Sequence, residues 1–224
     1  MTVTLFDYPK KTAFNRVLPK SKIYAYSKPS RSIRQRFVDE VDQIVWKYKL
    51  SPETLNLRAT KSVPEIQVFG ISLRTEEVSE SVLRTIDKAI SFPIFYELTF
   101  EDHLKVVAAY KRPSDADSAK WVVDTYFSSD WGNTKVVRDS LPVALSLGSL
   151  YEQMLRRLID IEAKPGESLK KQVERIAAIR GKEAECKKLE QRLGREKQFN
   201  RKVELNRELR TCKEEINALL GAQE

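Results

Sequence analysis

A break in composition at Pro165–Gly166 divides this 224-residue chain into two unlike parts. Beyond the break Phe199 is the only aromatic residue, and Lys, Glu, Arg and Leu predominate, a composition typical of coiled coils. Before the break, apolar residues recur in short runs that suit the strands and helices of one globular domain. We therefore expect a basic N-terminal arm at 1–36, an α/β domain at 37–163 and a helical segment at 164–224.

The apolar residues of the C-terminal part form a mirror image about residue 199. Pairs such as Leu193 with Leu205, and Cys186 with Cys212, lie at equal sequence distances from that point. In a helical hairpin each pair would meet across one interface, whereas one continuous helix would rotate the stripe by roughly 120° between Leu193 and Leu205. Two continuous helices packed antiparallel in a homodimer have the same mirror relation, so both arrangements stay open. The expected helix-interface residues are Ile179, Cys186, Leu189, Leu193, Leu205, Leu209, Cys212 and Leu219.

Apolar spacing in the rest of the chain predicts a mixed α/β fold. Strands are expected at 43–51, 64–74, 92–100, 103–111 and 118–129. Helices are expected at 12–18, from Ser30 or Ser32 through Phe37 towards Ile44, at 75–90 and from about Ser149. This order implies a mixed, mainly antiparallel sheet with flanking helices on one face, followed by the charged C-terminal helical hairpin or coiled coil.

Positive charge is concentrated at the N-terminus. Residues 1–36 hold nine Lys and Arg against the single acid Asp7, a net charge of +8, whereas 37–162 is mildly acidic and 163–224 is again basic. A basic surface raises the local concentration of a polyanion and speeds encounter with it. The candidate nucleic-acid-binding residues are Lys10, Lys11, Arg16, Lys20, Lys22, Arg31, Arg34 and Arg36.

Aromatic residues alternate with these cations and suit stacking on exposed bases. They are Phe6, Tyr8, Phe14, Tyr24 and Tyr26. The competing interpretation is that the rings belong to the core, while the cations are solvated or face an acidic protein partner. The salt dependence of binding would separate the two interpretations.

Several classes of protein lack their signatures in this sequence. No apolar run reaches the length of a membrane span and the N-terminus lacks the apolar stretch of a secretory signal, so we expect a cytoplasmic protein with reduced cysteines. The single histidine, His103, and two cysteines argue against a His- or Cys-based metal site. Phosphate-loop and dinucleotide glycine patterns are missing, so no cofactor is expected. The acids that lack the spacing of a calcium loop are Asp115, Asp117, Asp124 and Asp130.

Glu97 and Lys111 suggest a nuclease hypothesis. Restriction-type nucleases hold metal with an acid on one strand and an acid-x-lysine on the next, and these two residues lie on adjacent predicted strands. Position 109, two residues before Lys111, is alanine, so the second carboxylate that a Mg²⁺ site normally uses is missing. A cross-strand ion pair between Glu97 and Lys111 is the alternative interpretation.

Three stretches of the chain resemble one known family. They are LFDYPKKTAFNRVLPKSKIYAY (5–26), FPIFYELTF with VVAAYKRP (92–113) and REKQFNRKVELNRELR (195–210). They are similar to a family of bacterial and archaeal proteins classed as a domain of unknown function, and the likeness spans most of the chain. The resemblance implies a setting beside DEAD/DEAH- or SNF2-type helicases and site-specific DNA methyltransferases, as in restriction or anti-phage systems. It carries over no catalytic residue.

Together these features favour a non-catalytic accessory subunit of a helicase- or methyltransferase-containing DNA-processing system. We expect the C-terminal helices to dock on the larger enzyme or to form a homodimer, and the basic residues to contact nucleic acid. A metal-dependent nuclease, or a degenerate nuclease-like core, centred on Glu97 and Lys111 is the first alternative. A stand-alone nucleic-acid-binding protein is the second.

Overall fold

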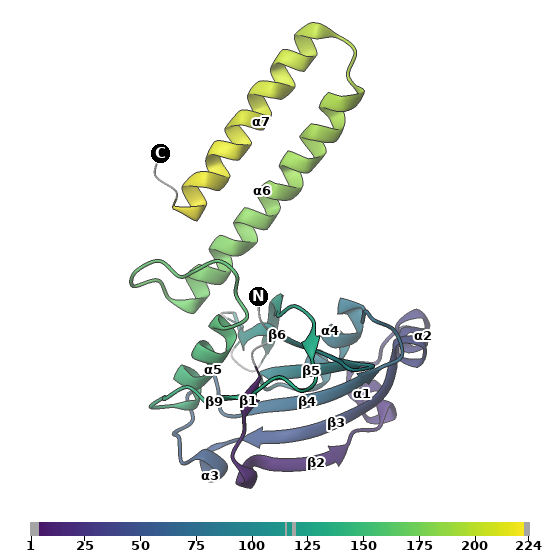
Figure 1. Ribbon diagram of the computed structural model, residues 1–224, viewed down its shortest axis with the longest axis vertical. Helices are drawn as coiled ribbons and strands as arrows, with labels where there is room; N and C mark the ends of the chain where they lie inside the picture. Colours follow the sequence, from purple (N-terminus) through teal and green to yellow (C-terminus); the bar gives the residue numbers. More distant parts are fainter. Residues whose placement is uncertain (1–4, 115, 118–119, 222–224) are drawn as a thin grey trace. The chain divides into compact units, whose positions relative to one another are not determined.

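The computed structural model of the chain describes residues 5–114, 116–117 and 120–221. Two compact units are present, Met1–Asp160 and Ile161–Glu224. The first unit is built around a β-sheet and the second contains two long helices (Figure 1). Among the described residues, no helix is both long enough and apolar enough to cross a membrane.

A seven-stranded sheet organises the first unit. Its strands are β2 (Ala13–Val17), β3 (Val41–Leu50), β4 (Ile66–Leu73), β5 (Ile94–Phe100), β6 (His103–Pro113), β7 (Trp121–Ser128) and β8 (Gly132–Asn133). Strands β2 to β7 lie side by side in sequence order, with β8 pairing β6. Only β4 and β5 run parallel, because the helix α4 (Glu80–Ala89) connects them and reverses the chain direction. The predicted mixed, mainly antiparallel sheet is therefore confirmed.

Further short elements complete this unit. They are β1 (Phe6–Asp7), which pairs in parallel with β9 (Asp139–Ser140), a 3-10 turn η1 (Lys10–Thr12), and the helices α1 (Lys20–Ser27), α2 (Arg31–Glu40), α3 (Pro52–Leu55) and α5 (Leu147–Arg156).

Helices cover both faces of the sheet. On one face α1, α2 and α4 share a core cluster with sheet residues that include Tyr96. On the other face α5 places Tyr151 against Phe95, with 6.1 Å between the ring centroids. Since successive strand residues point to opposite faces, the burial of both Phe95 and Tyr96 requires cover on both sides. The expectation of helices on one face only is therefore wrong.

The N-terminal segment differs from the predicted helix at 12–18. Ala13–Val17 is instead the edge strand β2, in which Arg16 pairs with Trp46 and Val17 with Val45 of β3. Asn15 in the middle of this strand has a positive φ of 46°, which a helix does not allow. Pairing with a neighbouring strand has overridden the local helical spacing, and the described residues 5–36 are part of the sheet domain.

The predicted helix after Pro29 is present as α2, but it is shorter than the apolar spacing indicates. The Ser30 hydroxyl caps it by accepting a hydrogen bond from the Ile33 amide. The helix ends at Glu40, because Val41 already belongs to β3. Val41 and Ile44 are thus strand residues of the same core, and α1 was not predicted.

The second unit contains the predicted helical hairpin. Helix α6 (Leu169–Arg195) and helix α7 (Phe199–Leu220) are joined by the three residues 196–198. Cys186, Leu189, Leu205 and Cys212 form their shared core, with Leu193, Leu209 and Ile216 packed against it. Ion pairs cross between the helices from Lys182 to Glu215 and from Lys213 to Glu190.

Candidate functional site

The candidate nucleic-acid-binding residues are mostly exposed. Lys10 and Lys11 lie in η1, Arg16 on β2, Lys22 on α1, and Arg31, Arg34 and Arg36 on α2. Lys20 is the exception, because its Nζ donates hydrogen bonds to the backbone oxygens of Phe37 and Val41 at the end of α2. Partial burial there lowers the pKa of Lys20. Lys20 therefore stabilises the fold, and the other seven candidate cations remain at the surface.

Aromatic rings hold two of these arginines in place. The Arg16 guanidinium lies over the Phe14 ring at 4.5 Å from its centroid, and Phe14 packs on Trp46 at 4.3 Å between centroids. Arg34 lies over Tyr24 at 5.4 Å. Cation–π contacts of this kind leave the edge of the guanidinium free for an outside anion.

The rings themselves are largely structural. Phe6 and Tyr8 are buried, whereas Phe14 and Tyr24 are half-buried against other aromatic residues. Tyr26 alone among the five candidate rings is strongly exposed, at 78%. The core interpretation therefore holds for four of the five rings. Tyr26 is the one candidate ring that is exposed enough to stack on a base.

Glu97 lies at the centre of an ion cluster on the α5 side of the sheet. Its carboxylate accepts from Lys47 Nζ at 2.6 Å and from Arg138 at 2.9 and 3.3 Å. Lys47 reaches across β4 at Gly70, where a Cβ atom would come within 2.8 Å of the lysine side chain. Burial alone would raise the pKa of Glu97, but the hydrogen bonds from Arg138 and Lys47 outweigh burial and hold that pKa below its ordinary value.

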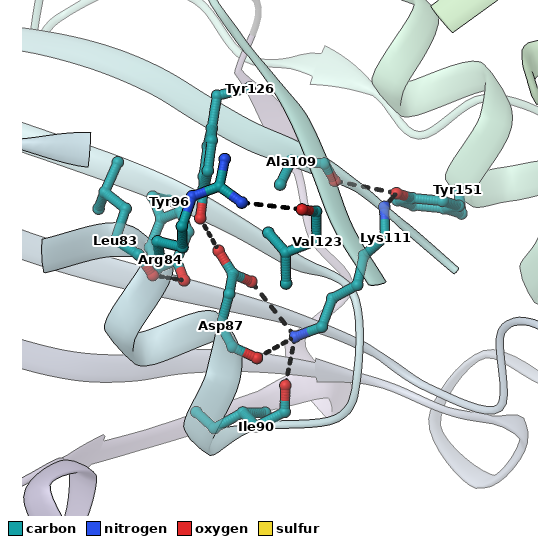
Figure 2. A network of polar contacts seen from close by, with 10 residues as sticks. All are labelled: Leu83, Arg84, Asp87, Ile90, Tyr96, Ala109, Lys111, Val123, Tyr126 and Tyr151. Atoms are coloured by element: carbon teal, nitrogen blue, oxygen red, sulfur yellow. Dashed lines mark hydrogen bonds and ion pairs between the residues drawn. The ribbon is translucent and has the colours of Figure 1, made fainter. Parts of the chain in front are cut away.

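Lys111 belongs to a different network, on the α4 side of the sheet (Figure 2). Its Nζ contacts Asp87 Oδ1 at 3.3 Å and donates to the backbone oxygens of Asp87 and Ile90 at the end of α4. Tyr126 donates its hydroxyl to the other Asp87 oxygen. Burial raises the pKa of Asp87 and lowers that of Lys111, and each partner's charge opposes the effect of burial.

Tyr151 ties the same strand to α5. Its hydroxyl donates to the Ala109 backbone oxygen at 3.0 Å and accepts from the Lys111 amide at 2.8 Å (Figure 2). Lys111 is thus held at both its backbone and its ammonium group. The Lys111 ammonium group therefore caps the C-terminal end of α4, where the helix dipole favours a cation.

The structure does not bring Glu97 and Lys111 together. Glu97 pairs in register with Val106 and faces α5, whereas Lys111 reaches Asp87 on the α4 side. Their expected cross-strand ion pair is therefore wrong, and each residue has other charged partners. Arg138 lies in a loop 41 positions from Glu97, and no local pattern marks it as a partner. Gly70 within the strand β4 is the one sequence signal that another side chain, here Lys47, passes close to the backbone.

The remaining candidate residues have ordinary environments. Asp117 pairs with Lys120, and His103 is an exposed residue at the start of β6. Asp115 lies outside the described residues. No group of three or more His, Cys, Asp or Glu side chains suited to a metal ion occurs in the described ranges. Cys186 and Cys212 are free thiols inside the hairpin.

The fold and these residues define a class, a mixed α/β sheet domain with a basic N-terminal region and an appended charged helical hairpin. Within that class, the chain belongs to the family Domain of unknown function (DUF4391), whose model matches residues 6–216. The family resemblance seen in the sequence is thereby confirmed. No curated protein and no solved structure matches the chain significantly.

Proposed function

We propose that this protein is a non-catalytic accessory subunit of a DNA-processing assembly that contains a helicase or a DNA methyltransferase. The basic residues of the sheet domain contact nucleic acid, and the charged outer surface of the hairpin docks on the larger subunit. The partner class comes from the setting that the family resemblance implies.

The unpaired positive charge of the first 36 residues carries the nucleic-acid part of the proposal. Within the described part of the chain, six of the exposed cations have no acidic side chain within 4.0 Å, whereas Arg36 approaches Glu40 at 3.9 Å. Like charges gathered on one domain repel each other and do not stabilise the fold. A polyanionic partner would offset that repulsion by replacing the counterions around these residues. The six cations are Lys10, Lys11, Arg16, Lys22, Arg31 and Arg34.

The environments of Glu97 and Lys111 favour this proposal over a nuclease. A metal-dependent nuclease needs its acid and its lysine on one side of the sheet around one metal and one phosphate. Glu97 and Lys111 point to opposite faces, and each is already held by neighbouring charges. Both residues are accounted for by the stability of the sheet domain.

The packing between α6 and α7 indicates which surface of the hairpin a partner could contact. The eight predicted interface residues are largely used between α6 and α7, so a partner would meet the outer surface of the helices. That surface is dominated by Lys, Arg and Glu, which suits a polar contact of the kind found in separable complexes.

Affinity purification from the native host tests the proposal directly. The tagged full-length chain is isolated with and without nuclease treatment, at low and high salt, and co-purifying proteins are identified by mass spectrometry. We expect a helicase or methyltransferase to remain after nuclease treatment. Recovery of nucleic acid alone, lost at high salt, would instead establish the stand-alone binding protein. Loss of biological activity in Glu97→Gln, with both partner recovery and the free energy of unfolding unchanged, would instead support the nuclease.

A further inference from the structure

An apolar groove of about 340 Å³ opens between α1 and the segment that leads from α4 into β5. Tyr26 and Lys22 of α1 line it, together with Ile90 and Phe92. Trp46 and Phe69, from the neighbouring strands β3 and β4, also belong to the lining. The volume lies in the range of small-ligand sites and suits one heteroaromatic ring with its sugar.

One aromatic ring at the groove, that of Tyr26, is not buried in the core. Tyr26 lines the groove and is 78% exposed, although it lies on a helix whose Ile23 is buried in the core. An exposed aromatic ring beside an apolar groove is a platform for another planar ring.

The charged residue in the groove lining is a lysine, and the Glu65 carboxylate lies behind the lining residue Gln67. Among the described residues, Lys22 lines the groove and no acidic residue does so. Arg16 lies further from the groove than Lys22 does. It packs over the Phe14 ring, and Phe14 in turn packs on the groove residue Trp46. Two cations beside an apolar site favour a ligand that joins an aromatic ring to a phosphate.

We propose that this groove binds one unstacked nucleobase of a nucleic-acid strand, with the base against Tyr26 and the adjoining phosphates near Lys22 and Arg16. The inference rests on the proposed nucleic-acid contact and narrows it to single strands or strand ends, because a base inside a duplex cannot enter the groove.

Fluorescence anisotropy with the full chain and a fluorescein-labelled single-stranded oligonucleotide tests the groove, with the matched duplex as comparison. Tyr26→Ala is expected to weaken single-strand binding about tenfold and Tyr26→Phe to retain it, because stacking needs the ring and not the hydroxyl. The salt dependence of Tyr26→Ala should equal that of the wild type, since its phosphate contacts remain. Val143→Ala, which changes an apolar side chain that is 94% exposed and outside the groove lining, is the matched control.

The outcomes separate the groove from the proposed function. Equal affinity of wild type and Tyr26→Ala, or tighter binding of the duplex, would overturn the groove inference while leaving the basic contact in place. Failure of the wild type to bind either oligonucleotide would overturn the proposed nucleic-acid contact and the groove together. Weaker binding of Tyr26→Ala that Tyr26→Phe restores supports both.

Discussion

At the residue scale, the two buried ionic sites show how the same residue types acquire different environments. Glu97 is surrounded by two cations, which favour its charged form. Asp87 is buried with one ammonium group and a tyrosine hydroxyl, and burial dominates its pKa. Both carboxylates lie in the same sheet domain, so the difference comes from the side chains that surround each one.

Replacing Glu97 tests the first site through pH. Its folded pKa lies below the unfolded value of about 4.3, so the ionised group stabilises the fold above that pH. This contribution is lost as the pH falls through the lowered folded pKa. The free energy of unfolding from urea denaturation should therefore differ most between wild type and Glu97→Gln near neutral pH, and the difference should shrink in acid. The exposed Glu152→Gln is the control, and a pH-independent difference for Glu97→Gln would contradict the assignment.

Removing the Lys111 ammonium tests the second site. Lys111 and Asp87 have side chains that are each 1% exposed, so Lys111→Met leaves a buried carboxylate without its cation. We expect a loss of about 3–5 kcal/mol in the free energy of unfolding, measured by urea denaturation. The double variant Asp87→Leu with Lys111→Met should recover part of that loss, since no uncompensated charge remains. Equal stability of the single variant and wild type would refute the network.

At the element scale, long periodic segments were predicted well and short ones were not. The mirror-symmetric stripe predicted two helical stretches packed antiparallel, because each turn repeats the same apolar signal. In the structure these are the 27-residue α6 and the 22-residue α7 of one hairpin. The five-residue β2 carries too little periodicity, and its pairing with β3 decided its conformation. The strands β4 to β7 were predicted because their apolar runs are long and interrupted by turns.

The cysteine pair tests the hairpin as an element. Cys186 and Cys212 lie in one cluster across the two helices, and burial with the neighbouring thiol raises the pKa of Cys212 to about 11. Because the two thiols are packed together, diamide oxidation of the folded chain should yield a monomer with an internal disulfide, seen by non-reducing electrophoresis and mass spectrometry. Cys212→Ser should abolish the faster-migrating monomer. A disulfide-linked dimer as the main product would favour the antiparallel pair instead.

At the scale of the whole molecule, the uneven distribution of charge along the chain says more about possible partners than the net charge does. The chain carries a formal net charge of +8, and residues 1–36 alone account for that value because the charges of the remaining residues cancel. These residues contribute β2, α1 and most of α2, so their cations are held on a folded domain. A held array loses less conformational entropy on binding a polyanion than a free arm would.

Charge reversal measures how many of these cations meet phosphates. Lys10→Glu, Lys11→Glu and Arg31→Glu together should lower the magnitude of the slope of log affinity against log salt by about 2 for single-stranded nucleic acid, since each phosphate contact contributes about 0.7. Fluorescence anisotropy over a series of salt concentrations gives the slope. The matched control reverses the same amount of charge elsewhere, at Arg58, Lys61 and Lys135. Equal slopes for the two triple variants would show that net charge, and not this region, drives binding.

The sequence by itself determined the mixed sheet, the mirror-symmetric apolar stripe of the C-terminal helices, the family and the location of the positive charge, because each of these follows from the spacing of residue types along the chain. Tertiary structure decided that Lys47 and Arg138, 50 and 41 positions from Glu97, surround that carboxylate. It also decided that Lys111 faces Asp87, and that Tyr26 stays exposed while Phe6 and Tyr8 are buried. The physical reason is that a side chain's burial and charged partners depend on which distant strands and helices pack beside it, and local periodicity carries no information about those neighbours.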